Sequence, residues 1–294
     1  MLIPEKEQEV PTIAATDKLT PPPPITATIV HRETKIGDSL CALPALLSLA
    51  GLFQGLITVR GPFSRAVTQL VATSLLAFEP NALTGEIADF RIDIHAAYKQ
   101  CNLQNQHMAV GLCRAIGLPA PSSPIFLDLV EAPLNLPPGL VISPFSGSSN
   151  GWYKVWPMDR WLRLVAIVKA YYPAMPVYLL AGIGDTTEAF SAVGCLPLIN
   201  HALPQVLHLI RRAHLFISID NGISHLAHFG RCTRHILLYP ALLAPNLVTN
   251  PAAQCFRGRP EDIDVGTIAA AALDVLGTPL PSNSPLPRSE QGAA

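Results

Sequence analysis

Short apolar runs alternate with longer segments of helical spacing through most of the chain. Apolar runs of about four to eight residues between turn signals are typical of buried strands. We expect strands at residues 25–31, 56–59, 88–94, 140–144, 177–181, 215–219 and 235–239. We expect helices at residues 39–50, 63–78, 104–116, 158–172, 204–212, 224–230 and 264–276, and a short one holding Glu188. This alternation predicts an α/β fold built on parallel sheets.

The pattern divides into two blocks, joined by a proline-rich connection at residues 119–138. We expect residues 25–135 and 136–277 to form two Rossmann-like domains. Residues 1–24 and 278–294 are rich in proline and polar residues, so we expect both to be disordered tails. Two such domains would place a ligand cleft between the carboxyl ends of their strands.

Composition narrows the classes of protein that this chain can be. Of 294 residues, 49% are hydrophobic and 14% are charged, with a net charge of -1. No long Lys/Arg stripe appears, so we expect no nucleic-acid partner. The six cysteines are scattered without CxxC spacing, which indicates reduced core thiols in a cytoplasmic protein. The motifs HExxH, Walker A and complete GxGxxG are missing from the sequence, which removes several common enzyme classes.

Residues 39–59 carry no charge and approach the length of a membrane-spanning helix. Pro44, Gly51, Gln54 and Gly55 interrupt this stretch. We therefore predict a buried helix followed by a strand, and peripheral contact with a membrane stays open.

The strand predicted at 215–219 ends in Asp220, Asn221 and Gly222, and a predicted helix follows. Such a corner presents backbone N–H groups and the positive end of a helix dipole, which suits a phosphate. His225 lies four residues after Asn221 and is either structural or part of the site. His228 follows it, but no third ligand is apparent, so we expect no metal site.

Two further corners follow predicted strands of the second block. Residues 146–157 include Ser148, Ser149 and Lys154, which fit either a diphosphate cradle or an ordinary polar loop. After the strand at 177–181, Asp185 or Glu188 could accept hydrogen bonds from a ribose or base, or cap a short helix.

In the first block, Asp38 lies at the corner after the first predicted strand. Gly37 would permit a tight turn there, and Asp38 or Ser39 could cap the next helix. Alternatively, Asp38 is a general base that takes a proton from a hydroxyl nucleophile. The pair Asp262 and Asp264 resembles the DxD of metal-dependent sugar transferases, but it precedes an apolar helix, so helix capping is the favoured interpretation.

Together these corners resemble the family 9 glycosyltransferases, the heptosyltransferase-like enzymes of lipopolysaccharide biosynthesis. The matching residues are Gly37-Asp38 with Pro44-Ala-Leu46, Lys154-Val-Trp-Pro-Met-Asp-Arg-Trp161, and Asp220-Asn-Gly-Ile-Ser-His-Leu-Ala227. The resemblance covers roughly residues 28–277. It implies a GT-B fold, with an N-terminal acceptor-side domain and a C-terminal domain that binds a nucleotide-sugar.

The resemblance also implies an activity and roles for single residues. The activity is inverting transfer of a heptose-like sugar, without a metal or other cofactor, from a nucleotide-diphospho-sugar, with ADP favoured, to a glycan or lipopolysaccharide-type acceptor. Asp38 would be the base, and Asp220 would orient its loop. Asp185 or Glu188 would meet the nucleoside. The diphosphate would be held by Ser148, Ser149, Lys154, the Asn221 and Gly222 amides, and His225.

Two departures from the family pattern bear on these expectations. Asn221 replaces the usual Ser or Thr, which removes a hydroxyl. The N-terminal block is also short by one or two strand–helix units, so the acceptor is not inherited from the family. An alternative is therefore a non-catalytic GT-B-like protein that binds nucleotide-sugars or acts as a scaffold. A further alternative is another two-domain enzyme acting on a nucleotide-sugar, such as an epimerase.

Overall fold

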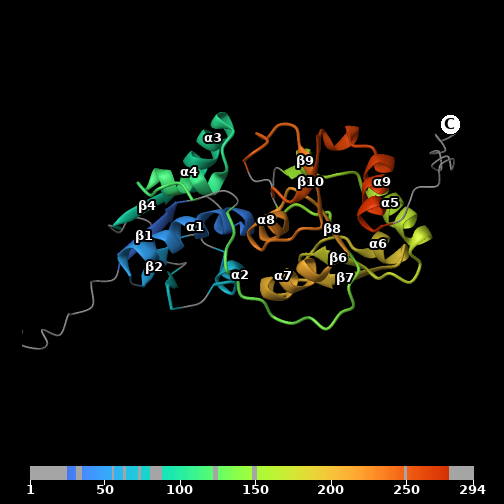
Figure 1. The fold of residues 1–294 in the computed structure, drawn as a ribbon, viewed down its shortest axis with the longest axis horizontal. Helices are drawn as coiled ribbons and strands as arrows, with labels where there is room; N and C mark the ends of the chain where they lie inside the picture. The colour runs from blue at the N-terminus through green and yellow to red at the C-terminus, as the bar shows by residue number, and fades with distance from the viewer. Residues whose placement is uncertain are drawn as a thin grey trace, which may run out of the picture.

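The computed structural model describes residues 25–30, 35–54, 56–61, 64–71, 74–79, 88–121, 125–147, 151–247 and 250–277. The two predicted tails lie outside these residues, and the predicted disorder stays a prediction. The chain forms two parallel sheets, each with its own helices, which lie side by side in Figure 1. The predicted α/β architecture with two Rossmann-like sheets is confirmed.

The first sheet has four parallel strands in the order β3-β2-β1-β4. Its strands are β1 (Ile25–Val30), β2 (Ile57–Arg60), β3 (Leu76–Glu79) and β4 (Phe90–Asp93). Its helices are α1 (Ile36–Phe53), α2 (Arg65–Thr68), α3 (Ile94–Gln104) and α4 (Met108–Ala115). Asp93 ends β4 and caps α3, because its carboxylate accepts a hydrogen bond from the Ala96 amide at 2.9 Å.

The second sheet has six parallel strands in the order β10-β9-β8-β5-β6-β7. Its strands are β5 (Leu140–Ser143), β6 (Val177–Ala181), β7 (Cys195–Ile199), β8 (Leu215–Ile219), β9 (His235–Pro240) and β10 (Ala253–Gly258). Its helices are α5 (Met158–Tyr171), α6 (Glu188–Ala192), α7 (Leu203–Arg212), α8 (Gly222–Phe229) and α9 (Val265–Val275), with 3₁₀ turns η1 (Gly151–Lys154) and η2 (Pro260–Asp262). Counted from β5, the strand order is 3-2-1-4-5-6, the order of dinucleotide-binding Rossmann folds.

This order fixes where a ligand can bind. The chain first extends the sheet from β5 to one side through β6 and β7, then returns to the other side with β8. The crossovers after β5 and β8 therefore diverge and leave a crevice at the carboxyl ends of these two neighbouring strands. In the first sheet, β1 and β4 hold the equivalent position.

Two apolar clusters form the interior. The larger one runs from the first sheet through α1 and α8 to one face of the second sheet. The smaller one lies on the other face of the second sheet, under α5 and α9. The first domain therefore shares its core with its neighbour, whereas the second domain also has a core of its own.

The shared core depends on a close contact between α1 and α8, which adjoin at the centre of Figure 1. A Cβ built on Gly37 would lie 2.7 Å from His225 Cδ2, and one built on Gly222 would lie 2.8 Å from Ile36 Cβ. Each helix thus places a glycine against a side chain of the other. The expected tight turn at Gly37 is wrong, because Gly37 lies inside α1 and is required there for the close approach.

Helix α1 contains most of the apolar segment at residues 39–59. Within the described part of the chain it is the one helix long and apolar enough to cross a membrane by length and composition. Its mean hydropathy is 1.7, and 61% of that stretch is buried inside the protein. The predicted buried helix followed by a strand is confirmed by α1 and β2.

Several predicted elements need correction. The helix predicted at 63–78 is wrong, because the described residues there form the short α2 and the strand β3. The helix predicted at 104–116 is two helices, α3 and α4, and starts earlier. Strands β7 and β10 were not predicted. All six cysteines are free, as expected, but Cys255 is exposed rather than part of the core.

Candidate functional site

A cavity of about 830 Å³ lies between the two domains. Its walls come from the carboxyl ends of β5, β6, β7 and β8, from the N-termini of α1 and α8, and from α3. The predicted cleft is therefore present, and the N-termini of two helices border it. Because amides and positive dipole ends gather at helix N-termini, this position favours an anion.

The strongest polar contact in the cavity joins Lys154 and Asp220. Lys154 Nζ donates to Asp220 Oδ2 at 2.6 Å, and the two side chains are 18% and 1% exposed. Burial lowers the pKa of Lys154, but the Asp220 carboxylate outweighs this effect, so the pKa lies above its ordinary value. The cation is thus retained at neutral pH. An ammonium has three donors, so Lys154 can bind Asp220 and a ligand oxygen together.

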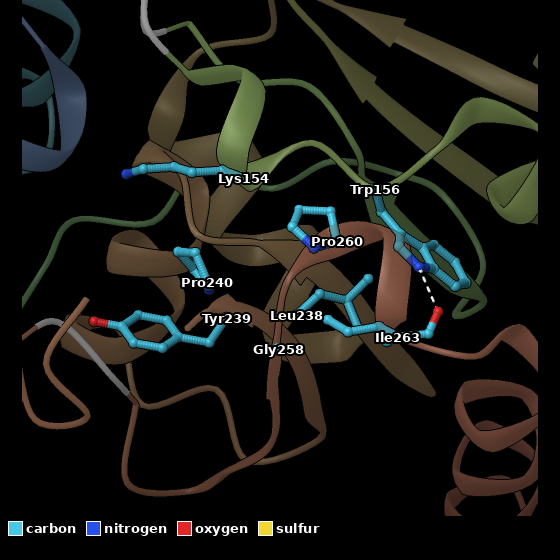
Figure 2. Close-up of a pocket in the computed structure, with 8 residues that line it drawn as sticks. All are labelled: Lys154, Trp156, Leu238, Tyr239, Pro240, Gly258, Pro260 and Ile263. Carbon is cyan, nitrogen blue, oxygen red and sulfur yellow. Dashed lines mark hydrogen bonds between the residues drawn. The ribbon is translucent and has the colours of Figure 1, made fainter. Parts of the chain in front are cut away.

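The backbone that carries Lys154 is anchored by Trp156. The Trp156 indole is buried, lies edge-on to Trp161 at 5.1 Å, and donates from Nε1 to the Ile263 carbonyl at 2.9 Å. Figure 2 shows this hydrogen bond and shows the Lys154 side chain extending away from the indole. The small pocket in Figure 2 has no room for a water molecule, so we interpret it as packing around this anchor.

Asn221 joins the ends of β5 and β8 across the crevice. Its Nδ2 donates to the Ser143 carbonyl, to Ser143 Oγ and to the Phe145 carbonyl, at 3.3, 2.9 and 3.0 Å. Its Oδ1 accepts from the Ile223 and Ser224 amides, both at 3.0 Å, and caps α8. A Ser or Thr at this position could not make both sets of hydrogen bonds. The amide side chain therefore compensates structurally for the missing hydroxyl.

Asn221 also occupies amides that could otherwise meet a phosphate. The Ile223 and Ser224 amides bond to its own side chain, and its own amide donates to Ser224 Oγ at 3.1 Å. Gly222, at the tip of α8, lines the cavity. Binding of diphosphate by either predicted amide stays a prediction.

Asp38 faces the cavity from the other domain. It lies in the first turn of α1, whose N-cap residue is Lys35, so the expectation that Asp38 caps this helix is wrong. Ser39, the other predicted cap, instead accepts a hydrogen bond from the Ser64 amide at 2.9 Å. A negative charge in the first turn is favoured by the helix dipole, which supports an ionised carboxylate at this wall of the cavity.

His225 lies at the base of the cavity, between the two domains. Its Nε2 is 3.8 Å from Asp220 Oδ1, and its Nδ1 is 3.6 Å from Cys41 Sγ on α1. Burial lowers the pKa of His225 to about 4, against the opposing effect of Asp220, so the ring is neutral at pH 7. These contacts give His225 a clear structural role, and binding of phosphate by it stays a prediction.

Of the remaining predicted site residues, some line the cavity and others do not. Asp185 lines the cavity after β6, and its Oδ2 accepts from the Gly182 amide at 2.6 Å. Glu188 is exposed in the first turn of α6, away from the residues that line the cavity. Ser148 and Ser149 lie outside the described residues. Asp264 caps α9 by accepting from the Thr267 amide at 2.9 Å, as predicted.

The cavity residues that were not predicted from the sequence include Lys35, His95, Tyr98 and Tyr153. Lys35 Nζ donates to the Gly147 carbonyl at 2.8 Å, a contact between the two domains. Burial and, to a lesser extent, the neighbouring Tyr153 side chain raise the pKa of Tyr98, an interaction that also crosses the domains. His95 and Tyr98 follow directly after β4, so the strand end was their one sequence signal. Among the described residues, no group of three His, Cys, Asp or Glu side chains could hold a metal ion.

The sequence matches no protein-family model and no curated protein. Solved structures do match. Escherichia coli heptosyltransferase WaaC with ADP has a TM-score of 0.60 at 14% identity, over 85% of this chain and 100% of that chain. A glycosyl transferase family 9 structure from Veillonella parvula has a TM-score of 0.62 at 12% identity, over 86% and 97%. The chain has the fold of the family 9 glycosyltransferases. The resemblance drawn from the three motifs is thus confirmed at the level of the GT-B fold.

A third match shows that length differs among the proteins of this fold. The iron-containing dodecameric glycosyltransferase TibC from enterotoxigenic E. coli has a TM-score of 0.54 at 17% identity, over 73% of this chain. This chain spans 57% of that TibC chain, and 62% of TibC in its complex with ADP-D-beta-D-heptose.

Proposed function

We propose that this protein is a glycosyltransferase that moves a sugar from a nucleotide-diphospho-sugar to a hydroxyl of a glycan or lipopolysaccharide-type acceptor. The observation that carries the proposal is the position of the Lys154–Asp220 pair. It lies beside the N-terminus of α8 at the Rossmann crevice and shares one cavity with Asp38. An anion site and a carboxylate base are thus offered from opposite domains.

The donor would lie along the carboxyl edge of the second sheet. Its diphosphate would meet Lys154 and the Gly222 amide over β5 and β8. Its nucleoside would extend toward β6, where the Gly182 amide already orients the Asp185 carboxylate. An acid after the second strand of a Rossmann unit is the usual partner of ribose hydroxyls. We favour ADP as the nucleotide because WaaC binds ADP and TibC binds ADP-D-beta-D-heptose in structures of this fold.

In the proposed reaction, the acceptor hydroxyl oxygen forms a bond to the anomeric carbon as the bond from that carbon to the diphosphate breaks. The proton of the hydroxyl passes to Asp38, acting as general base. The electron pair of the broken bond leaves with the nucleoside diphosphate. Lys154 and the N-terminus of α8 stabilise that charge without a metal ion. Direct displacement of this kind inverts the anomeric configuration.

Nucleotide binding is the first test. Thermal stabilisation is measured with ADP, UDP, GDP and CMP, each against the unliganded protein. We expect one nucleotide to stabilise the protein, by roughly 2.7 kcal/mol at 100 times its dissociation constant. Lys154→Ala should reduce this shift relative to its own unliganded melting temperature, and Lys169→Ala on α5 is the matched lysine control. If Lys154→Ala does not fold, the double variant Lys154→Met/Asp220→Asn removes both charges together.

Turnover is the second test, measured as nucleoside diphosphate release from an ADP-sugar with a panel of glycan acceptors. Asp38→Asn should lower the rate by about 100-fold or more while nucleotide stabilisation persists. Asp159→Asn, in the first turn of α5, is the matched acidic control. Nucleotide binding without turnover in the wild type would instead support the non-catalytic alternative, and stabilisation by none of the nucleotides would overturn the proposal.

A further inference from the structure

Three aromatic side chains follow one another from the interior of the cavity to its rim. Tyr98 of α3 and Tyr153 of η1 both line the cavity. The Trp152 ring lies edge-on to Tyr153, with 6.1 Å between ring centroids. Trp152 is 80% exposed, whereas Trp156 and Trp161 are each 1% exposed. Trp152 therefore adds little to the core, and its ring is accessible to a ligand that contacts Tyr153.

The position of this aromatic row is set by the order of the strands. Along the carboxyl edge of the second sheet, Asp185 follows β6 on one side of the crevice. The turn η1, which holds Trp152 and Tyr153, contacts β9 on the other side. Lys154 is close to this row, with Nζ 5.7 Å from the centroid of the Tyr153 ring. The aromatic row and the carboxylate at Asp185 therefore lie on opposite sides of the anion site.

The chemistry of the row suits a sugar ring. Pyranose rings present faces of C–H groups that pack on aromatic rings, and they present hydroxyls at their edges. Tyrosine and tryptophan combine an apolar ring with a polar group and lose little conformational freedom on binding. Burial raises the pKa of Tyr98 to about 12, so its hydroxyl stays protonated and can donate. The neighbouring cation, Lys154, is already paired with Asp220, so this wall offers a sugar stacking and neutral hydrogen bonds.

We propose that Trp152, Tyr153 and Tyr98 form an aromatic platform that binds an uncharged sugar ring of the acceptor. The inference rests on the proposed function, because the anion site at Lys154 defines which end of the donor lies near the platform. The acceptor is favoured over the transferred sugar for two reasons. Tyr98 belongs to the domain that carries Asp38, and Trp152 continues the row out of the cavity, where a longer glycan would emerge.

Trp152 makes the platform measurable without a known acceptor, because the other two tryptophans are buried. The full chain, with ADP present, is titrated with cellobiose, lactose and chitobiose, and with glucuronic acid as an acidic probe. Trp152 fluorescence should change with at least one neutral disaccharide. Tyr98→Ala should weaken the response at least tenfold, and Tyr98→Phe, which keeps the ring, by about threefold or less.

Two controls separate a platform from a change in folding. Tyr171→Ala, at an exposed aromatic on α5, should leave disaccharide binding unchanged. Disaccharide binding to Trp152→Ala is measured by calorimetry, because this variant lacks the reporter, and should fall at least tenfold. Melting temperatures of all variants establish that they fold.

The proposal is overturned if none of the neutral disaccharides changes Trp152 fluorescence, if only glucuronic acid does, or if Tyr98→Ala and Trp152→Ala bind as the wild type does. These outcomes are separate from failure of the proposed function, which the thermal shift with ADP reports independently. Nucleotide stabilisation with no disaccharide response would contradict the aromatic platform but not the proposed function. Disaccharide binding without any nucleotide stabilisation would support a sugar site but contradict the proposed transferase function.

Discussion

The two sheets of this protein are wound in the same order but differ in width. The second sheet has six strands, with a core on each face, and holds most of the polar residues of the cavity. The first sheet stops at four strands, and its core continues into the second domain through α1 and α8. The wider domain thus supplies Lys154 and Asp220, the proposed anion site. The narrower one supplies Asp38 and Tyr98, on helices that its neighbour helps to hold.

This difference separates binding from catalysis in a testable way. If the second domain holds the nucleotide, changes there should alter ligand binding and stability together. If the first domain contributes the base and part of the acceptor wall, changes at Asp38 should alter turnover alone. The free energies of unfolding of single variants show how far the stability of each domain depends on its own contacts and how far on the contact between α1 and α8.

The largest effect on stability is expected in the second domain, from Lys154→Met. The change leaves the buried Asp220 carboxylate without its cation, so the free energy of unfolding should fall by about 3–5 kcal/mol. Urea unfolding measures this, and Lys169→Met, at a lysine on α5 that donates to the Gly194 carbonyl, is the control. A loss below about 1 kcal/mol would equal that of an exposed ion pair and would show that the site is hydrated.

The next effect is a loss of stability at acidic pH, which arises from buried histidines in the shared core and in β9. Burial lowers the pKa of His225 to about 4, and those of His107 and His235 to about 3. Since these pKa values lie below the unfolded value, the contribution to stability is full above about pH 6.5 and is lost as pH falls toward 4. At pH 5 we expect a loss of about 2 kcal/mol for each histidine.

Urea unfolding at pH 7.5 and pH 5 measures this slope. His107→Gln, which removes a histidine packed on His228 between the domains, should make stability less dependent on pH. The exposed His95→Gln should leave the dependence unchanged, and equal slopes for the two variants would place the acid-sensitive groups elsewhere.

A smaller effect on stability distinguishes Asp264, which only caps a helix, from Asn221, which also connects the ends of two strands. Asn221→Ala removes the cap of α8 and the hydrogen bonds to the end of β5, whereas Asp264→Ala removes only the cap of α9. Loss of a cap alone costs about 1 kcal/mol, so we expect about 1 kcal/mol for Asp264→Ala and about 2 kcal/mol or more for Asn221→Ala. Equal losses in chemical denaturation would show that the crevice does not depend on Asn221.

The smallest effect on stability tests the contact between α1 and α8. Gly37→Ala places a Cβ 2.7 Å from His225 Cδ2, so we expect a loss of about 1–2 kcal/mol from overpacking. Gly51→Ala, on the same helix with nothing within 4 Å, should be stabilising by up to about 1 kcal/mol through helix propensity. A gain at both positions in thermal unfolding would mean that α1 and α8 separate easily.

The strands that the sequence did not predict are β3, β7 and β10, and all three lie at sheet edges. An edge strand is only partly buried, so its apolar signal is weak: β10 alternates between exposed and half-buried residues. β7 also contains Pro197, which is tolerated at an edge and reads as a loop in a sequence. The central strands of the second sheet were predicted because both their faces are buried.

The same reasoning applies to the site. Lys154, Asp185 and Asp220 could be predicted because each follows a strand of one sheet, and the carboxyl ends of parallel strands meet at one edge. Tyr98 and Tyr153 could not be predicted together, because their contact exists only once two domains pack against each other. Asp38 was correctly placed at the cavity, but its helix begins three residues earlier than expected, which removed its capping role.

The glycine contact between α1 and α8 also bears on how the reaction is organised in time. The separation of Asp38 from Lys154 and Asp220 is set where two helices pack closely, each with a glycine against a side chain of the other. If the proposed function holds, the base and the leaving-group site are held at a fixed spacing before any substrate arrives. Such preorganisation supplies effective molarity without domain closure. Substrate entry and product exit, rather than assembly of the catalytic groups, would then set the pace of turnover.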